Sequence, residues 1–233
     1  MGSSGILSNL SFSIGPFVIT TSLLITWLIM ILLCLISYFL TRKLVVEPGK
    51  IQVVSEAVIT AMRNTISAVL PEHTDLVLPF IATLWIFILV SNLIGIIPGL
   101  QSPTGDLSVT AGLAILTFLS VHWFGVRADG WKTYLLHYVR PSFILLPFHL
   151  ISEVSRTIAL AVRLFGNVMS LEFTALLLLM IAGFLVPIPI LMLHIVEAII
   201  QAYIFGMLAL IYIAGGIQAQ ELRKVKQSIG EST

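Results

Sequence analysis

The sequence predicts an all-α polytopic membrane protein with five membrane helices. Of its 233 residues, 58% are hydrophobic and 10% are charged, whereas about 25% of the residues of a soluble domain are charged. The mean hydropathy is +1.07, and five apolar stretches reach the roughly 20 residues that a helix needs to cross a bilayer. We therefore expect a single membrane domain over 1–233, and a net charge of +1 gives no indication of a nucleic-acid partner.

The first two expected elements differ in polarity. Phe17 to Leu40 is apolar throughout and ends in a basic flank with no small-residue cleavage site, so we expect a retained membrane helix over 17–41. Between Ile51 and Val69, apolar residues recur at helical spacing with charged residues on the other face. This pattern predicts an interfacial amphipathic helix over 50–70.

Two stretches of ordinary length follow. Leu76 to Ile97 and Leu107 to Val126 each match one crossing of a bilayer, and they predict membrane helices over 76–98 and 107–126.

The last two apolar blocks are too long for upright helices. They cover Phe148 to Leu185 and Ile190 to Gln218, with two prolines between them. At 1.5 Å per residue they measure about 57 and 43 Å, against a hydrocarbon core of about 30 Å. We therefore expect a strongly tilted helical hairpin, over 143–185 and 188–219, that lies against a curved partner surface and is followed by a cytoplasmic tail over 220–233.

The basic residues indicate the orientation of the chain. Ten of the 12 Lys and Arg residues fall on one side of the membrane if the N-terminus is outside, and the other two, Arg156 and Arg163, lie within a membrane block. Because cytoplasmic loops carry the excess of basic residues, we expect an outside N-terminus and a cytoplasmic C-terminus. The lack of a targeting segment favours a bacterial or archaeal inner membrane.

The first long block carries five ionisable residues, and a charge near mid-bilayer costs about 2.5 to 3.5 kcal/mol. They are His149, Glu153, Arg156, Arg163 and Glu172. Arg163 has no acidic residue three or four positions away, so its partner must come from elsewhere, and a function inside the membrane is favoured over a structural role. At 100° per residue, Glu172 points about 180° away from Arg163.

Other polar residues have structural alternatives. Glu153 and Arg156 are three residues apart, which favours a self-neutralising pair. His194, Glu197 and Gln201 share one helix face, which suits a hydrated half-pore but also fits a packed polar interface or a metal site that includes His149. The remaining histidines are expected to be solvated or interfacial: His73, His122 and His137.

Several kinds of site are missing from the sequence. It contains no phosphate-binding loop, no nucleophile elbow and no H-E-x-x-H motif. Its single cysteine, Cys34, excludes a disulfide within the chain. The chain is therefore expected to move something across the membrane, with no nucleotide or hydrolytic site and no metal or cofactor of its own.

The stretch SRTIALAVRLFGN, from Ser155 to Asn167, resembles the signature of subunit a of F-type ATP synthases. The similarity continues through Glu172 and through HIVEAIIQAYIF, which contains His194 and Gln201. It also includes Pro79 to Gly99 and Pro103 to Thr110, so that it extends over roughly 79–218 of the chain.

The resemblance implies a fold in which the tilted hairpin faces a rotating ring of small subunits, each with one membrane carboxylate. It implies two offset half-channels for H⁺ or Na⁺, with Arg163 matching the arginine between them. The implied partners are the c-subunit ring, the peripheral-stalk b subunits, the F1 head and the lipid bilayer. The chain would be enzymatic only as part of that ion-translocating complex.

The resemblance also assigns roles to single residues. Glu172 and His194 belong to the outer half-channel, Gln201 is expected near Arg163, and Asn167 is expected to position the hydrated ion. Glu197 is an addition to this face and would suit a sodium-type or divergent branch. The inner half-channel is less well defined, since many family members have an acid at the position of His149, and its candidates here are His149, Glu153 and Arg156.

Two other kinds of protein are compatible with long apolar helices and few charges. One is a secondary transporter, against which the absence of an internal repeat and the overlong hairpin both argue. The other is the stator channel of a flagellar or similar motor, against which the RLFGN register argues.

Overall fold

The computed structural model describes residues 12–14, 17–42, 49–97, 100, 102–129, 146–182 and 187–230. Its elements are β1 (Phe12–Ile14), β2 (Phe17–Ile19), α1 (Thr21–Thr41), α2 (Lys50–Val69), α3 (Thr74–Ile94), the short 3₁₀ helix η1 (Pro103–Gly105), α4 (Leu107–Asp129), α6 (Leu146–Ala182) and α7 (Pro187–Gly230). Five of these helices, α1, α3, α4, α6 and α7, are long and apolar enough to cross a membrane. The predicted fold class is thus confirmed: an all-α polytopic membrane protein with five membrane helices.

The first membrane helix begins later than predicted, at Thr21 instead of residue 17. Phe17–Ile19 is a strand that pairs antiparallel with Phe12–Ile14, and Ser13 lies opposite Val18. Two residues of sequence, Gly15 and Pro16, join the strands, and a short loop with glycine is typical of hairpins. The prediction was wrong here because a short apolar run does not distinguish a strand from a helix.

Helices α6 and α7 are the longest elements, with 37 and 44 residues. At 1.5 Å per residue they measure about 55 and 66 Å, well above the thickness of a bilayer core of about 30 Å. Helix α7 also runs on to Gly230, so the separate tail expected over 220–233 is largely a continuation of the helix. The segment QAQELRKVKQ consists mostly of strong helix formers, which explains the extension.

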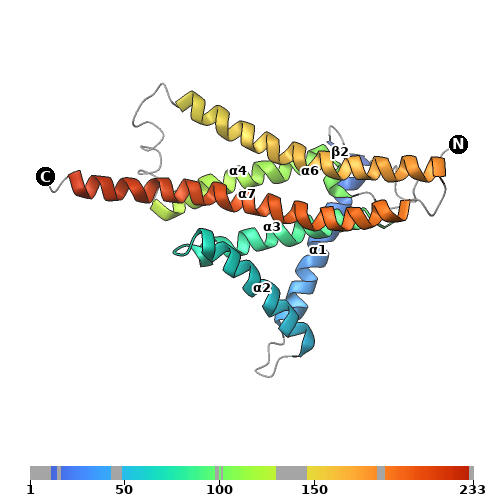
Figure 1. Cartoon of the computed structure of the whole chain (residues 1–233), viewed down its shortest axis with the longest axis horizontal. Coiled ribbons are helices and arrows are strands. Elements are labelled where there is room, and N and C mark those ends of the chain that lie inside the picture. The colour runs from blue at the N-terminus through green and yellow to red at the C-terminus, as the bar shows by residue number, and fades with distance from the viewer. Residues whose placement is uncertain are drawn as a thin grey trace.

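Helices α3 and α4 lie along the α6–α7 hairpin and bury its inner side (Figure 1). Trp85 of α3 stacks on Tyr203 of α7 and donates a hydrogen bond from Nε1 to the Tyr203 carbonyl oxygen, at 3.2 Å. The indole also occupies the space where a Cβ atom of residue 206 would lie, so Gly206 is needed for this close approach. Apolar clusters around Ile88 and Leu210 complete the core.

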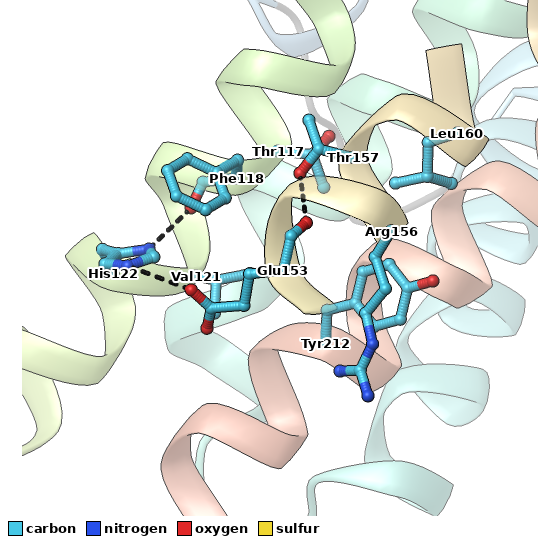
Figure 2. Close-up of a pocket in the computed structure, with 9 residues that line it drawn as sticks. All are labelled: Thr117, Phe118, Val121, His122, Glu153, Arg156, Thr157, Leu160 and Tyr212. Carbon is cyan, nitrogen blue, oxygen red and sulfur yellow. Dashed lines mark hydrogen bonds and ion pairs between the residues drawn. The ribbon is translucent and has the colours of Figure 1, made fainter. Parts of the chain in front are cut away.

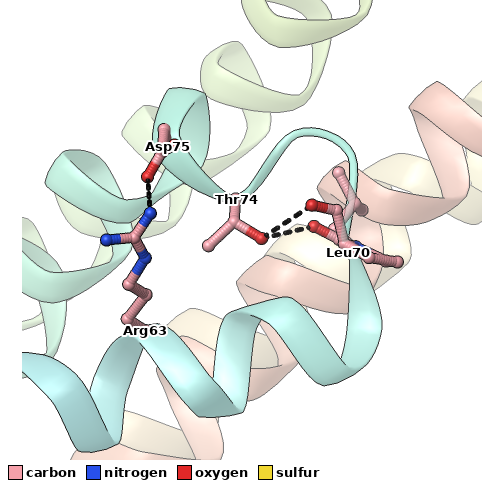
Figure 3. A network of polar contacts seen from close by, with 5 residues as sticks. Arg63, Leu70, Thr74 and Asp75 are labelled. Atoms are coloured by element: carbon pink, nitrogen blue, oxygen red, sulfur yellow. Dashed lines mark hydrogen bonds and ion pairs between the residues drawn. The ribbon is translucent and has the colours of Figure 1, made fainter.

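Helices α1 and α2 diverge from this core (Figure 1). Only three residues of α1 are buried, Ser22, Ile25 and Ile29. At the turn from α2 to α3, the Thr74 hydroxyl donates to the carbonyl oxygen of Leu70 at 2.8 Å, and Arg63 pairs with Asp75 at 2.8 Å (Figure 3). These contacts lie at the turn from α2 into the start of α3.

Candidate functional site

A buried polar cluster lies where the end of α3 meets η1. The Ser102 hydroxyl donates to the Ser91 carbonyl oxygen at 2.8 Å and is 2.7 Å from the Thr104 hydroxyl, which donates to Asn92 Oδ1 at 2.6 Å. All four side chains are buried. Nothing in the sequence distinguishes these four residues as functional, although they lie in or beside segments that carry the family resemblance.

Glu172 of α6 reaches the same cluster. Its Oε1 accepts a hydrogen bond from the backbone N–H of Ser102 at 3.2 Å. A Cβ atom built at Gly95 would lie 2.9 Å from Oε1, and one built at Gly105 would lie 3.3 Å from Oε2. Two glycines therefore make room for the carboxylate, which is held by the loop between α3 and α4.

The polar residues of α7 face inward as well. His194 and Gln201 are both 2% exposed, and Glu197 is half-buried. The His194 ring lies against the backbone of Asn92 and within electrostatic reach of Glu197. The i, i+7 spacing thus places His194 and Gln201 on the buried side of α7, with His194 near the end of α3.

Gln201 is joined to α6 through Asn167. The Asn167 side-chain amide donates to Gln201 Oε1 at 3.1 Å. Asn167 lies one helical turn after Arg163, so this bond brings α7 close to the part of α6 that carries the arginine.

Several buried donors and acceptors of this site have no hydrogen-bond partner within the described chain. They are Ser91 Oγ, Asn92 Nδ2, His194 Nε2 and Gln201 Nε2. A buried polar atom without a partner costs about 1 to 3 kcal/mol, and water is the usual partner where several polar groups converge. This arrangement favours a hydrated path over a dry polar interface between helices.

Arg163 lies on the opposite side of α6 from Glu172. Its side chain is exposed on the surface of the chain, and it has no hydrogen bond or ion pair with any residue that the structure describes. The carboxylate of Glu172, nine residues later, is directed to η1. The sequence-based prediction that these two residues address different environments agrees with this geometry.

A second polar group lies toward the first half of α6 (Figure 2). Glu153 Oε2 is 3.6 Å from His122 Nε2 on α4, and the Arg156 guanidinium lies over the Tyr212 ring of α7, 5.4 Å from its centroid. Glu153 and Arg156 point in different directions, so the expected pair within α6 is not formed (Figure 2). The hypothesis of pairing failed because neighbouring helices offer each side chain another partner.

Other expectations for histidines are changed or fall outside the described residues. His122 was expected to be solvated or interfacial, but it is half-buried within α4, where its ring faces Glu153 of the neighbouring helix α6. The side chain of His149 and all of His137 lie outside the described residues. Among the residues that are described, no three metal-ligating side chains cluster.

Five membrane helices around buried polar residues, beside an arginine without a partner in the described chain, are typical of a membrane protein that translocates ions. Comparison with known proteins identifies the family, since residues 23–214 match the ATP synthase A chain. The chain therefore belongs to the family of ATP synthase subunit a. It is the ion-channel component of the membrane sector of that enzyme complex.

Individual relatives are similar in sequence to this chain over almost its whole length. ATP synthase subunit a of Legionella pneumophila strain Philadelphia 1 is 65% identical over 230 residues, which cover 98% of this chain and 100% of the relative. ATP synthase subunit a 2 of Pelobacter propionicus is 54% identical over 213 residues, or 91% and 93% of the two chains. ATP synthase subunit a 2 of a Bradyrhizobium species is 42% identical over 217 residues, or 93% and 97%.

Proposed function

We propose that this chain forms two half-channels separated by Arg163 and passes H⁺ or Na⁺ to and from carboxylates on a rotating c-subunit ring. The observation that carries this proposal is the position of Arg163 between two polar groups on α6. Glu153 lies ten residues before it and Glu172 nine residues after it, which corresponds to about 15 and 14 Å along the helix. Ions that reach either group would still have to pass the arginine.

The outer half-channel is assigned to the cluster around Glu172. With the N-terminus outside, α3 ends and α4 begins at the outer surface, so Glu172, Ser102 and Asn92 form the outer part of this path. His194 continues it along α7, and Gln201 with Asn167 leads to Arg163. The four buried polar atoms without a partner in the described chain support this route, because water and a hydrated ion would satisfy them.

Arg163 is suited to divide the two paths because guanidinium stays protonated at any working pH. It offers hydrogen-bond donors but no acceptor, so it cannot relay a proton. A ring carboxyl that faces lipid is favoured in its neutral, ion-loaded form, whereas one beside Arg163 is favoured as the anion. A ring site therefore gives up its ion before it passes the arginine and takes another afterwards, and this difference biases the rotation.

The ring would contact the exposed surface of α6 and α7. Ile158 and Val162, next to Arg163, are 57% and 54% exposed in the chain alone. An exposed charge in an apolar setting costs about 2.5 to 3.5 kcal/mol near mid-bilayer, so an acidic partner on another subunit is the chemistry that this surface requires. The b subunits and the F1 head complete the proposed complex, with the nucleotide chemistry on the head.

The proposal also includes the location and the state of the chain. It lies in a cell inner membrane with its N-terminus outside and its C-terminus in the cytoplasm, and it carries no cofactor of its own. Stimulation of ATP hydrolysis by Na⁺ at fixed pH would identify Na⁺ as the transported ion, and its absence would identify H⁺.

The central test is Arg163→Ala in the complete complex. We expect the variant to assemble with the ring and the head but to lose ion-driven ATP synthesis, because nothing would separate the two paths. Arg63→Ala, which removes an exposed arginine of α2, is the matched control and should keep synthesis. Normal synthesis in the Arg163 variant would refute the proposal, and transport by the purified chain alone would favour a secondary transporter.

A further inference from the structure

A pocket lies between α4, α6 and α7, beside the first half of α6 (Figure 2). We call it the inner pocket, and the polar side chains that line it are Thr117, His122, Glu153, Arg156, Thr157 and Tyr212. The proposed function requires a second half-channel on this side of Arg163, and the family resemblance does not define its lining. The contacts within the inner pocket suggest which residues supply it.

The first contact sets the protonation of one ring nitrogen of His122. Its Nδ1 lies 3.0 Å from the carbonyl oxygen of Phe118, one turn earlier in α4. A carbonyl oxygen can only accept a hydrogen bond, so Nδ1 must carry a proton. A neutral His122 therefore has its lone pair on Nε2, the nitrogen that faces Glu153 (Figure 2).

The second contact then requires one further proton. Nε2 of His122 and Oε2 of Glu153 are 3.6 Å apart. A lone pair and a carboxylate oxygen at this distance repel each other, whereas either an imidazolium or a carboxylic acid makes the contact favourable. The pair therefore holds one exchangeable proton. Because 3.6 Å exceeds a direct hydrogen bond, a bridging water fits between the two groups.

The other polar groups of the inner pocket are less suited to exchange. The hydroxyls of Thr117 and Thr157 donate to the carbonyl oxygens of Leu113 and Glu153, at 2.9 Å each. The guanidinium of Arg156 does not titrate, and it lies over the Tyr212 ring. Among the described residues, the charged or titratable groups that face the pocket are thus His122 from α4, Glu153 and Arg156 from α6, and Tyr212 from α7. Of these, His122 and Glu153 are the two whose side chains approach each other, at 3.6 Å.

A purely structural role does not explain why these two residues are paired here. A half-buried ion pair longer than a hydrogen bond stabilises a fold little, and apolar residues of similar size are often as good or better. We propose, on the basis of the proposed function, that His122 and Glu153 form the exchange site of the inner half-channel. There a transported proton passes between the ring and cytoplasmic water. The pair takes up one proton from one side and releases one to the other, so that only N–H and O–H bonds change.

The test uses substitutions in the assembled complex, in inside-out membrane vesicles. We expect Glu153→Gln, which keeps the shape of the side chain, to lose most ATP-driven ion uptake while assembly is unchanged. Proton uptake in Na⁺-free buffer and ²²Na⁺ uptake with a protonophore show which cation is affected. The double variant H122L/E153L distinguishes a structural role of the pair from a role in proton exchange. A variant that assembles but has lost uptake supports the exchange site, and a variant with normal uptake overturns it.

Access of water to the site is measured with Ag⁺, which binds thiolates. Cys34 is first replaced by Ser, and Thr157→Cys, which lines the inner pocket, is compared with Leu119→Cys, an exposed apolar position of α4. We expect Ag⁺ to inhibit uptake through the thiol at 157 and not at 119. If the Thr157→Cys variant is insensitive to Ag⁺ and Glu153→Gln transports normally while Arg163→Ala still loses synthesis, this inference fails and the proposed function stands.

Discussion

The glycines around the Glu172 carboxylate allow a graded test of its position, because each can be replaced by alanine. A methyl group at Gly95 would lie 2.9 Å from Glu172 Oε1 and 2.9 Å from Ser102 Cβ, closer than real Cβ contacts. Gly95 has φ −62° and ψ −12°, a conformation that alanine adopts without strain. Any effect of Gly95→Ala therefore comes from displacement of the Glu172 carboxylate and of Ser102, which holds it, and not from strain in the backbone of residue 95.

The size of the effect follows from the contact that is lost. Displacing Glu172 breaks its hydrogen bond with the Ser102 N–H, and a hydrogen bond to a charged group contributes about 1.5 to 3 kcal/mol. Since 1.4 kcal/mol corresponds to a factor of ten, ion transfer through the outer half-channel should slow by about 10- to 100-fold if that bond holds Glu172 in its working position. Assembly should change less, because Gly95 lies at the end of α3 and outside both apolar core clusters.

The assay is ATP-driven ion uptake by vesicles, normalised to the amount of assembled complex. Gly105→Ala, with its Cβ 3.3 Å from Oε2, should have a smaller effect, and Gly112→Ala, with no atom within 4 Å, should have none. We therefore expect ion uptake to be lowest for Gly95→Ala, higher for Gly105→Ala and normal for Gly112→Ala. Equal activity of the variants at 95 and 112 would refute the idea that the position of Glu172 controls uptake.

Three further substitutions test packing and hydrogen bonding. Gly206→Ala should lower the thermal stability of the complex by about 1 to 3 kcal/mol, because its Cβ overlaps the Trp85 indole; unchanged stability would contradict that packing. Asn167→Leu should cost about 1 to 3 kcal/mol by leaving Gln201 Oε1 unpaired, and a double variant with Gln201→Leu should regain stability but not ion uptake. Arg63→Ala should cost under about 1 kcal/mol in a melting experiment, because Arg63 and Asp75 are 55% and 78% exposed.

Those site residues could be predicted from the sequence that are unusual in their own local surroundings. Arg163 stands out because a charge in an apolar helix is costly wherever it points. Ser91 and Ser102 do not stand out, because serine is ordinary at a helix end or in a loop. Their role depends on Glu172, which is 70 residues from Ser102 in the chain and meets it only after α6 packs on η1.

Pairings between helices were the least predictable feature. Spacing along α6 favoured Glu153 with Arg156, since residues three apart share a helix face. Such a rule ignores neighbouring helices, and in the structure His122 and Tyr212 provide the partners. Contacts of this kind depend on the rotation and register of packed helices, which local spacing does not specify.

Composition and the helical repeat are enough to predict five membrane helices, a final pair longer than the bilayer is thick, and a charge at Arg163 with no acidic residue three or four positions away. These features follow from properties of neighbouring residues. The two glycines that admit Glu172, the bond from Asn167 to Gln201 and the contact of His122 with Glu153 arise only when the helices pack together. Each of these depends on side chains from different helices meeting within a few ångströms, and such distances are set by packing.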